Sequence, residues 1–132
     1  MKQITKFGCI YNLHPIHDLY ASDDDGHIID INEKKNIQVQ KHEDYLYINV
    51  KSQGSEFAIP YSIQRFVWEC FNSIVPKFSV IEHINNNERD NRLSNLQLVS
   101  KNIRKYYIIE YNVIENLFYK MTVDIKKNSQ KQ

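Results

Sequence analysis

One stretch in the second half of the chain organises the rest. Residues 80–104 read VIEHINNNERDNRLSNLQLVSKNIR. A short apolar run ends in the adjacent pair Glu82 and His83, and a loop made almost entirely of Asn, Asp, Glu and Arg follows. A second short apolar run, 96–99, leads into a basic stretch. Two apolar runs around a polar loop are typical of paired strands, so the stretch predicts a strand at 78–82, a loop at 84–94 and a return strand at 96–99. Ser100 is a suitable N-cap for a helix that begins at Lys101.

The spacing of the polar residues in this stretch resembles that of the HNH nucleases, specifically the homing-endonuclease-like branch found in phage and other mobile elements. The family pattern runs (Asp/Glu)-His-Ile-x-x-Asn-x-x-x-Asn-Arg-x-x-Asn-Leu. Eight positions match it over fifteen residues: Glu82, His83, Ile84, Asn87, Asn91, Arg92, Asn95 and Leu96. The resemblance extends roughly over residues 45–105 and is most specific at 80–99.

The resemblance implies both a fold class and a division of the chain. The fold expected is α+β, with a small N-terminal antiparallel sheet and a helix followed by a ββα-metal (HNH, His-Me finger) motif. Residues 1–77 would form the β-rich region with one helix, 78–105 the HNH motif, and 106–132 a C-terminal extension that contacts DNA. The activity implied is that of a metal-dependent DNA endonuclease, a hydrolase acting on phosphodiester bonds.

The roles of four motif residues follow from the resemblance and from their chemistry. His83 is the expected general base, since imidazole titrates near neutrality. Glu82 is the expected metal ligand, because Mg²⁺ and Mn²⁺ prefer carboxylate oxygen. Family members more often have Asp at this position. Asn95 matches the structural asparagine whose amide fixes the loop, and Asn91 would brace the turn.

The basic residues of the motif are expected to contact DNA. Arg92 would either touch phosphate or brace the loop. Lys101, Arg104 and Lys105 follow the second apolar run, and residues 101–132 carry seven Lys/Arg against three Asp/Glu. A positive charge concentrated just after the motif favours phosphate contacts with double-stranded DNA.

The second metal ligand of the family falls about nine residues after the structural asparagine, on the helix. That position is Arg104 here, and the nearest asparagine, Asn102, lies seven residues after Asn95. We take Asn102 as the expected second ligand, with a helix start shifted by the shorter junction. This displacement and Glu82 in place of Asp leave an alternative open, namely an HNH-fold DNA-binding protein with weakened or lost cleavage.

Charge, cysteine content and hydropathy bear on other classes of protein. The net charge is +1, so no overall basic field marks a nucleic-acid partner. Cys9 and Cys70 are the two cysteines, and the sequence has no CxxC pair, so no structural zinc is expected. No apolar run approaches the length of a membrane span. We expect a cytoplasmic (intracellular) protein of phage, viral or mobile-element origin, a monomer or a homodimer, without membrane association.

The first 77 residues predict strands followed by one helix. Asp23-Asp24-Asp25-Gly26 separates two short apolar runs, which indicates a hairpin; a solvated turn is favoured there over a Ca²⁺ site. Residues 45–50 alternate as a strand with Leu46, Ile48 and Val50 on one face, and residues 57–59 predict another. A helix is predicted by apolar residues at helical spacing, which are Ile63, Phe66, Val67, Cys70 and Phe71. His14 and His17 form an HxxH pair, for which a structural or surface role is favoured over a metal site.

Overall fold

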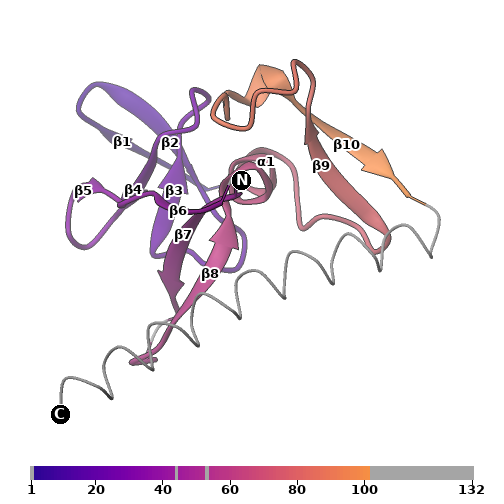
Figure 1. Ribbon diagram of the computed structural model, residues 1–132. Coiled ribbons are helices and arrows are strands. Elements are labelled where there is room, and N and C mark those ends of the chain that lie inside the picture. Colours follow the sequence, from indigo (N-terminus) through magenta and orange to yellow (C-terminus); the bar gives the residue numbers. More distant parts are fainter. Residues whose placement is uncertain (1, 44, 53, 102–132) are drawn as a thin grey trace, which may run out of the picture.

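The computed structural model describes residues 2–43, 45–52 and 54–101. Within these residues the chain forms ten strands, one α-helix and one short 3₁₀ helix, arranged as two antiparallel sheets and a two-stranded hairpin around the helix (Figure 1). The small N-terminal sheet expected from the sequence is therefore two sheets.

The first sheet is a five-stranded antiparallel meander in chain order. Its strands are β1 (Gln3–Lys6), β2 (Cys9–Leu13), β3 (Tyr20–Ser22), β4 (Ile28–Asp30) and β5 (Lys35–Asn36). A two-residue turn joins β1 to β2, and both of its residues, Phe7 and Gly8, have positive φ (52° and 74°). Such a turn follows the right-handed twist of the strands, which is why it closes a tight hairpin.

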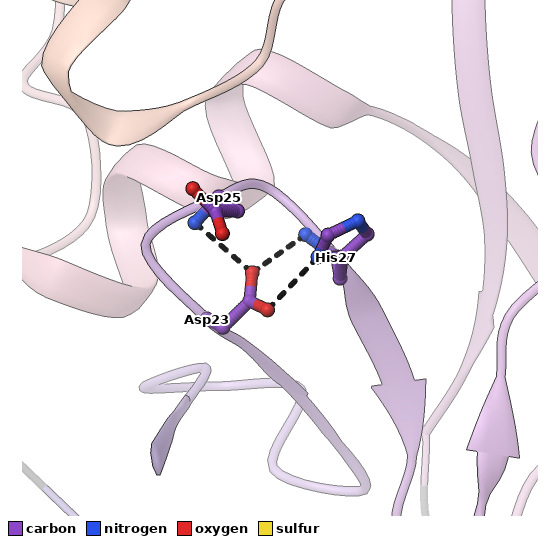
Figure 2. Close-up of side chains that lie close together, drawn as sticks. All are labelled: Asp23, Asp25 and His27. Atoms are coloured by element: carbon purple, nitrogen blue, oxygen red, sulfur yellow. Dashed lines mark hydrogen bonds and ion pairs between the residues drawn. The ribbon is translucent and has the colours of Figure 1, made fainter. Parts of the chain in front are cut away.

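The predicted hairpin around the Asp-Gly turn is confirmed as β3 and β4, with Ser22 paired opposite Ile28. One carboxylate organises the turn between them. Asp23 Oδ1 accepts hydrogen bonds from the backbone N–H of Asp25 (3.1 Å) and of His27 (2.8 Å), and Asp23 Oδ2 lies 2.9 Å from His27 Nδ1 (Figure 2). The prediction of a solvated turn is wrong for Asp23, which is 8% exposed because it holds the loop from inside.

The second sheet has three antiparallel strands, β6 (Gln40–His42), β7 (Tyr45–Lys51) and β8 (Ala58–Ser62). The alternation predicted for β7 places Ile48 and Val50 in the core, where neither has any exposed surface. Tyr47 on the opposite face is buried as well, and its ring stacks with that of Tyr45 at 6.5 Å. The strand predicted at 57–59 begins one residue later, and Phe57 is exposed.

The helix α1 (Ile63–Phe71) lies between the sheets and the hairpin formed by β9 (Ser79–His83) and β10 (Leu96–Ser100) (Figure 1). Its predicted apolar face is confirmed, with Phe71 half-buried at its end. The main core draws on β3, β4, β7, α1, β9 and β10 and consists of Tyr20, Ile28, Ile48, Val50, Ile63, Phe66, Val67, Cys70, Ile81 and Leu96. One core thus joins the N-terminal sheets to the hairpin.

A buried carboxylate on α1 ties the helix to segments distant in sequence. Glu69 accepts a short hydrogen bond from the Tyr61 hydroxyl, lies 2.9 Å from His14 Nε2, and accepts the backbone N–H of Val75 at 2.8 Å. His14 Nδ1 accepts two backbone N–H groups, so Nε2 carries the proton given to Glu69. The HxxH histidine His14 is therefore structural, as favoured from the sequence.

Candidate nuclease site

Residues 79–100 fold as the predicted strand–loop–strand unit. β9 and β10 pair antiparallel, with Glu82 opposite Gln97 and His83 opposite Leu96. The loop between them ends in a 3₁₀ turn, η1 (Leu93–Asn95). The expected helix, with Asn102, Arg104 and Lys105, lies outside the described residues.

His83 ends β9 half-buried, and its ring is held by an amide. His83 Nε2 lies 2.7 Å from Asn91 Oδ1. An amide oxygen only accepts, so Nε2 carries the proton and Nδ1 keeps its lone pair. Asn91 is 8% exposed and its Nδ2 also donates to the Glu88 carbonyl at 3.4 Å. The sequence suggested Asn91 as a brace of the turn; its direct bond to the histidine was missed.

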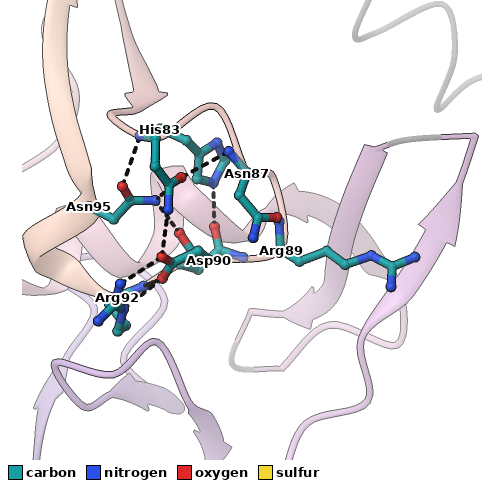
Figure 3. A network of polar contacts seen from close by, with 8 residues as sticks. His83, Asn87, Arg89, Asp90, Arg92 and Asn95 are labelled. Carbon is teal, nitrogen blue, oxygen red and sulfur yellow. Dashed lines mark hydrogen bonds and ion pairs between the residues drawn. The ribbon is translucent and has the colours of Figure 1, made fainter.

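Asn95 fastens the two ends of the loop together. Its Oδ1 accepts the backbone N–H of Asn85 at 3.1 Å, and its Nδ2 donates to the Asp90 carbonyl at 2.8 Å and to Asn85 Oδ1 at 2.9 Å (Figure 3). Asn95 is 6% exposed, so these bonds are shielded from water. A buried amide that satisfies two parts of one loop restricts it to a single conformation.

Arg92 braces the same loop. Its Nε and one terminal nitrogen each lie 2.8 Å from an oxygen of Asp90, a two-point contact (Figure 3). Arg92 holds the pKa of the Asp90 carboxyl well below its usual range, and Asp90 in turn raises the pKa of Arg92. Of the two roles expected for Arg92, this contact corresponds to the brace.

Glu82 and Lys101, for which the sequence predicted different roles, form an ion pair. Lys101 Nζ lies 2.7 Å from Glu82 Oε1, and the two side chains are 23% and 42% exposed. The carboxylate of Glu82 therefore already faces a cation in a position open to solvent. One carboxylate open to solvent suits Mg²⁺, which keeps several waters and binds through one or two carboxylates together with substrate phosphates.

A groove beside the loop adds two cations that sequence reasoning missed. It has a volume of about 280 Å³ and is lined by Lys41, Leu46, Asn86, Asn87, Glu88 and Arg89. Figure 3 shows the Arg89 side chain extending away from the network around His83 and Asn95. Lys41 comes from β6, so the groove forms only in the folded protein and had no signal in the local sequence.

Comparison with known proteins identifies the class of this hairpin and its helix. Residues 61–106 match the family described as HNH endonuclease, a range that starts on β8 and contains α1, β9 and β10. This segment therefore resembles the HNH endonucleases, the family that the motif indicated. No curated protein matches it.

A solved structure extends the likeness to most of the fold. It is described as DNA binding and cleavage by the HNH homing endonuclease I-HmuI, and it is similar to this chain with a TM-score of 0.60 at 20% sequence identity. The match covers 91% of this chain and 64% of the I-HmuI chain, so this chain spans less than two thirds of that endonuclease. Among residues 2–43, 45–52 and 54–101, no helix has the length and apolar character needed to cross a membrane.

Proposed function

We propose that the protein is a metal-dependent DNA endonuclease that hydrolyses phosphodiester bonds with His83 as the general base. The observation that carries the proposal is the 2.7 Å contact between His83 Nε2 and Asn91 Oδ1. It fixes the neutral tautomer in which Nδ1 accepts a proton, the form that a base needs in order to activate water. The half-buried position at the end of β9 holds the ring in place while leaving part of it open to solvent.

Glu82 would hold the divalent cation, Mg²⁺ or Mn²⁺, and Asn102 is the proposed second ligand. When bound, the metal supplies positive charge that stabilises the phosphorane. Lys101 lies beside the same carboxylate and would neutralise it in the free protein. Asn91 would hold the His83 ring and Asn95 would hold the loop, so that both keep their places relative to Glu82.

Replacing Lys101 by methionine is expected to strengthen Mn²⁺ binding about three- to fivefold. The ammonium competes with the divalent cation for Glu82, and a partly exposed ion pair is worth about 0.7–1 kcal/mol. Calorimetric titration with Mn²⁺ in the absence of DNA measures the change. Lys35→Met is the matched control, because Lys35 of the edge strand β5 also forms an exposed ion pair, in this case with Glu33. Weaker Mn²⁺ binding in Lys101→Met would contradict this competition.

Double-stranded DNA is the proposed partner. Lys41 and Arg89 in the groove, together with Lys101, Arg104 and Lys105, are the proposed phosphate contacts, while Arg92 braces the loop through Asp90. A monomer with one site would nick one strand, whereas a twofold dimer could cut both.

The test is conversion of supercoiled plasmid with Mg²⁺ or Mn²⁺, compared with the same reaction in EDTA. We expect relaxed or linear plasmid only with metal. The metal should also raise the melting temperature, because a ligand that binds only the native state stabilises it.

The second candidate is an HNH-fold DNA-binding protein that does not cut. The ion pair between Glu82 and Lys101 favours it, since a carboxylate neutralised by lysine has less need of a metal. This candidate predicts retardation of DNA in a gel, intact plasmid and no change of melting temperature at millimolar Mg²⁺ or Mn²⁺.

A further inference from the structure

The β3–β4 turn, residues 23–27, packs against the loop that carries Asn91. The backbone N–H of Leu93 donates to the Asp24 carbonyl at 2.9 Å. Gly26 lies directly on the Asn91 backbone, so an added Cβ would overlap the Asn91 carbonyl oxygen and lie 2.8 Å from its carbonyl carbon. Two segments more than sixty residues apart therefore meet at the residue that binds His83.

Gly26 is needed at this contact for two separate reasons. Its φ of +86° is a conformation that residues with a Cβ rarely adopt. Gly8 shares that condition, with φ of +74°, but nothing lies within 4 Å of its hypothetical Cβ. Gly26 thus shares its positive φ with Gly8 but differs in its contact with Asn91, so Gly8 serves as its control.

Hydrogen bonds and buried strand ends hold the turn in place. Asp23 accepts two backbone N–H groups of the turn, and its own carbonyl accepts the Ser22 hydroxyl at 2.8 Å. Ser22 and Ile28, the strand residues on either side, are buried. The turn is thus anchored in the core and presents Gly26 to the loop at a defined place.

We propose that the turn 23–27 is a positioning element for His83 and acts through the backbone of Asn91. This inference rests on the proposed function, because it assigns a further part to the same site. The Asn91 backbone is held on one side by Gly26, and its side chain binds His83 Nε2 on the other. A methyl group at position 26 pushes Asn91 from the ring, so that Nε2 loses its partner and the tautomer of His83 is no longer fixed.

The test compares Gly26→Ala with Gly8→Ala in the full chain. We expect Gly26→Ala to lower the plasmid cleavage rate about 100-fold, the effect typical of a displacement near 1 Å in a catalytic site. KM for DNA should stay within about twofold, since the phosphate-binding side chains are unchanged. Gly8→Ala should keep the rate despite similar backbone strain.

Nitrogen NMR of ¹⁵N-histidine protein at mildly alkaline pH supplies a readout independent of cleavage. The NMR signals of His83 are identified as those missing from the spectrum of His83→Ala. We expect the tautomer protonated at Nε2 in the wild type and in Gly8→Ala, and a mixture in Gly26→Ala. If the wild type does not cut but the tautomer still changes in Gly26→Ala, the positioning role stands and the proposed function fails. An unchanged tautomer in Gly26→Ala overturns the positioning role.

A second pair of variants applies if Gly26→Ala does not fold. Asp23→Ala removes the carboxylate that holds the turn without placing an atom on Asn91, and Asp23→Asn keeps an acceptor and should restore the His83 tautomer. Asp30→Ala is the control, because Asp30 accepts the N–H groups of Asn32 and Glu33 in the same manner in the β4–β5 turn. A mixed tautomer in Asp23→Ala alone supports the proposal; the same spectrum in Asp23→Ala and the wild type contradicts it.

Discussion

His83→Ala is expected to lower the rate of plasmid cleavage about 10²- to 10⁴-fold, the contribution of a positioned general base. His83 Nε2 lies 2.7 Å from Asn91 Oδ1, which leaves Nδ1 to accept the proton in the proposed reaction. The substitution removes no proposed phosphate contact, so retardation of DNA in a gel should stay within about twofold of the wild type. Single-turnover nicking of supercoiled plasmid in Mn²⁺ measures the loss.

Two comparisons make the result specific to His83. His42→Ala, on strand β6, should cut at the wild-type rate. A contaminating nuclease would give the same rate in every preparation, including His83→Ala. Free imidazole should restore part of the rate of His83→Ala, because the small ring fills the space and accepts the proton. A His83→Ala protein that cuts as fast as the wild type would show that another group is the base.

Glu69→Ala is expected to destabilise the fold by about 3–5 kcal/mol, the usual cost of breaking a buried hydrogen-bonded ionic group. The Glu69 side chain has no exposed surface. Its loss leaves His14 Nε2–H, the Tyr61 hydroxyl and the Val75 N–H without their acceptor inside the core. Urea denaturation at neutral pH measures the change in the free energy of unfolding.

The same carboxylate gives the stability a pH dependence. Burial alone would raise the pKa of Glu69, but hydrogen bonds from His14, Tyr61 and the Val75 N–H, with the charge of Arg65, outweigh it and lower the pKa below 4.5. A depressed folded pKa means that the stabilisation is complete above about 4.5 and is lost as the pH falls through the lowered value. The acid limb of the stability curve should therefore flatten in Glu69→Ala.

Glu69→Gln is the matched variant, since it keeps a side-chain oxygen of the same reach and loses the charge. It should be less destabilised than Glu69→Ala and should share the flattened acid limb. Equal stability of Glu69→Ala and the wild type at neutral pH would mean that the network does not hold α1 in place.

The local pattern of the sequence predicted most of the regular structure. The helix at 63–71, the hairpin around the Asp-Gly turn and the strands on either side of the polar loop all followed from apolar periodicity and turn residues. These signals are local, because period and turn chemistry act between residues close in sequence. The division into two sheets was missed, since pairing between strands depends on contacts that a single run of residues does not record.

In the candidate site, too, the sequence predicted the local arrangement but not the contacts between side chains. The spacing of Glu82, His83, Asn91 and Asn95 was sufficient to bring the four onto one hairpin, and the family match agrees with it. The contacts that each of these side chains makes were not predicted from the spacing. The pairing of Glu82 with Lys101 depends on the register between β9 and β10 and was not predicted.

By itself, the sequence determined the HNH hairpin, the order of its polar residues and the helix beneath it, because these depend on spacing along the chain. Only the tertiary structure decided that Gly26 lies on Asn91, that Glu69 binds His14, and that Lys41 shares a groove with Arg89. Each of these contacts joins segments more than forty residues apart. Burial of one apolar core brings such segments together, so their polar partners are fixed only once the core has formed.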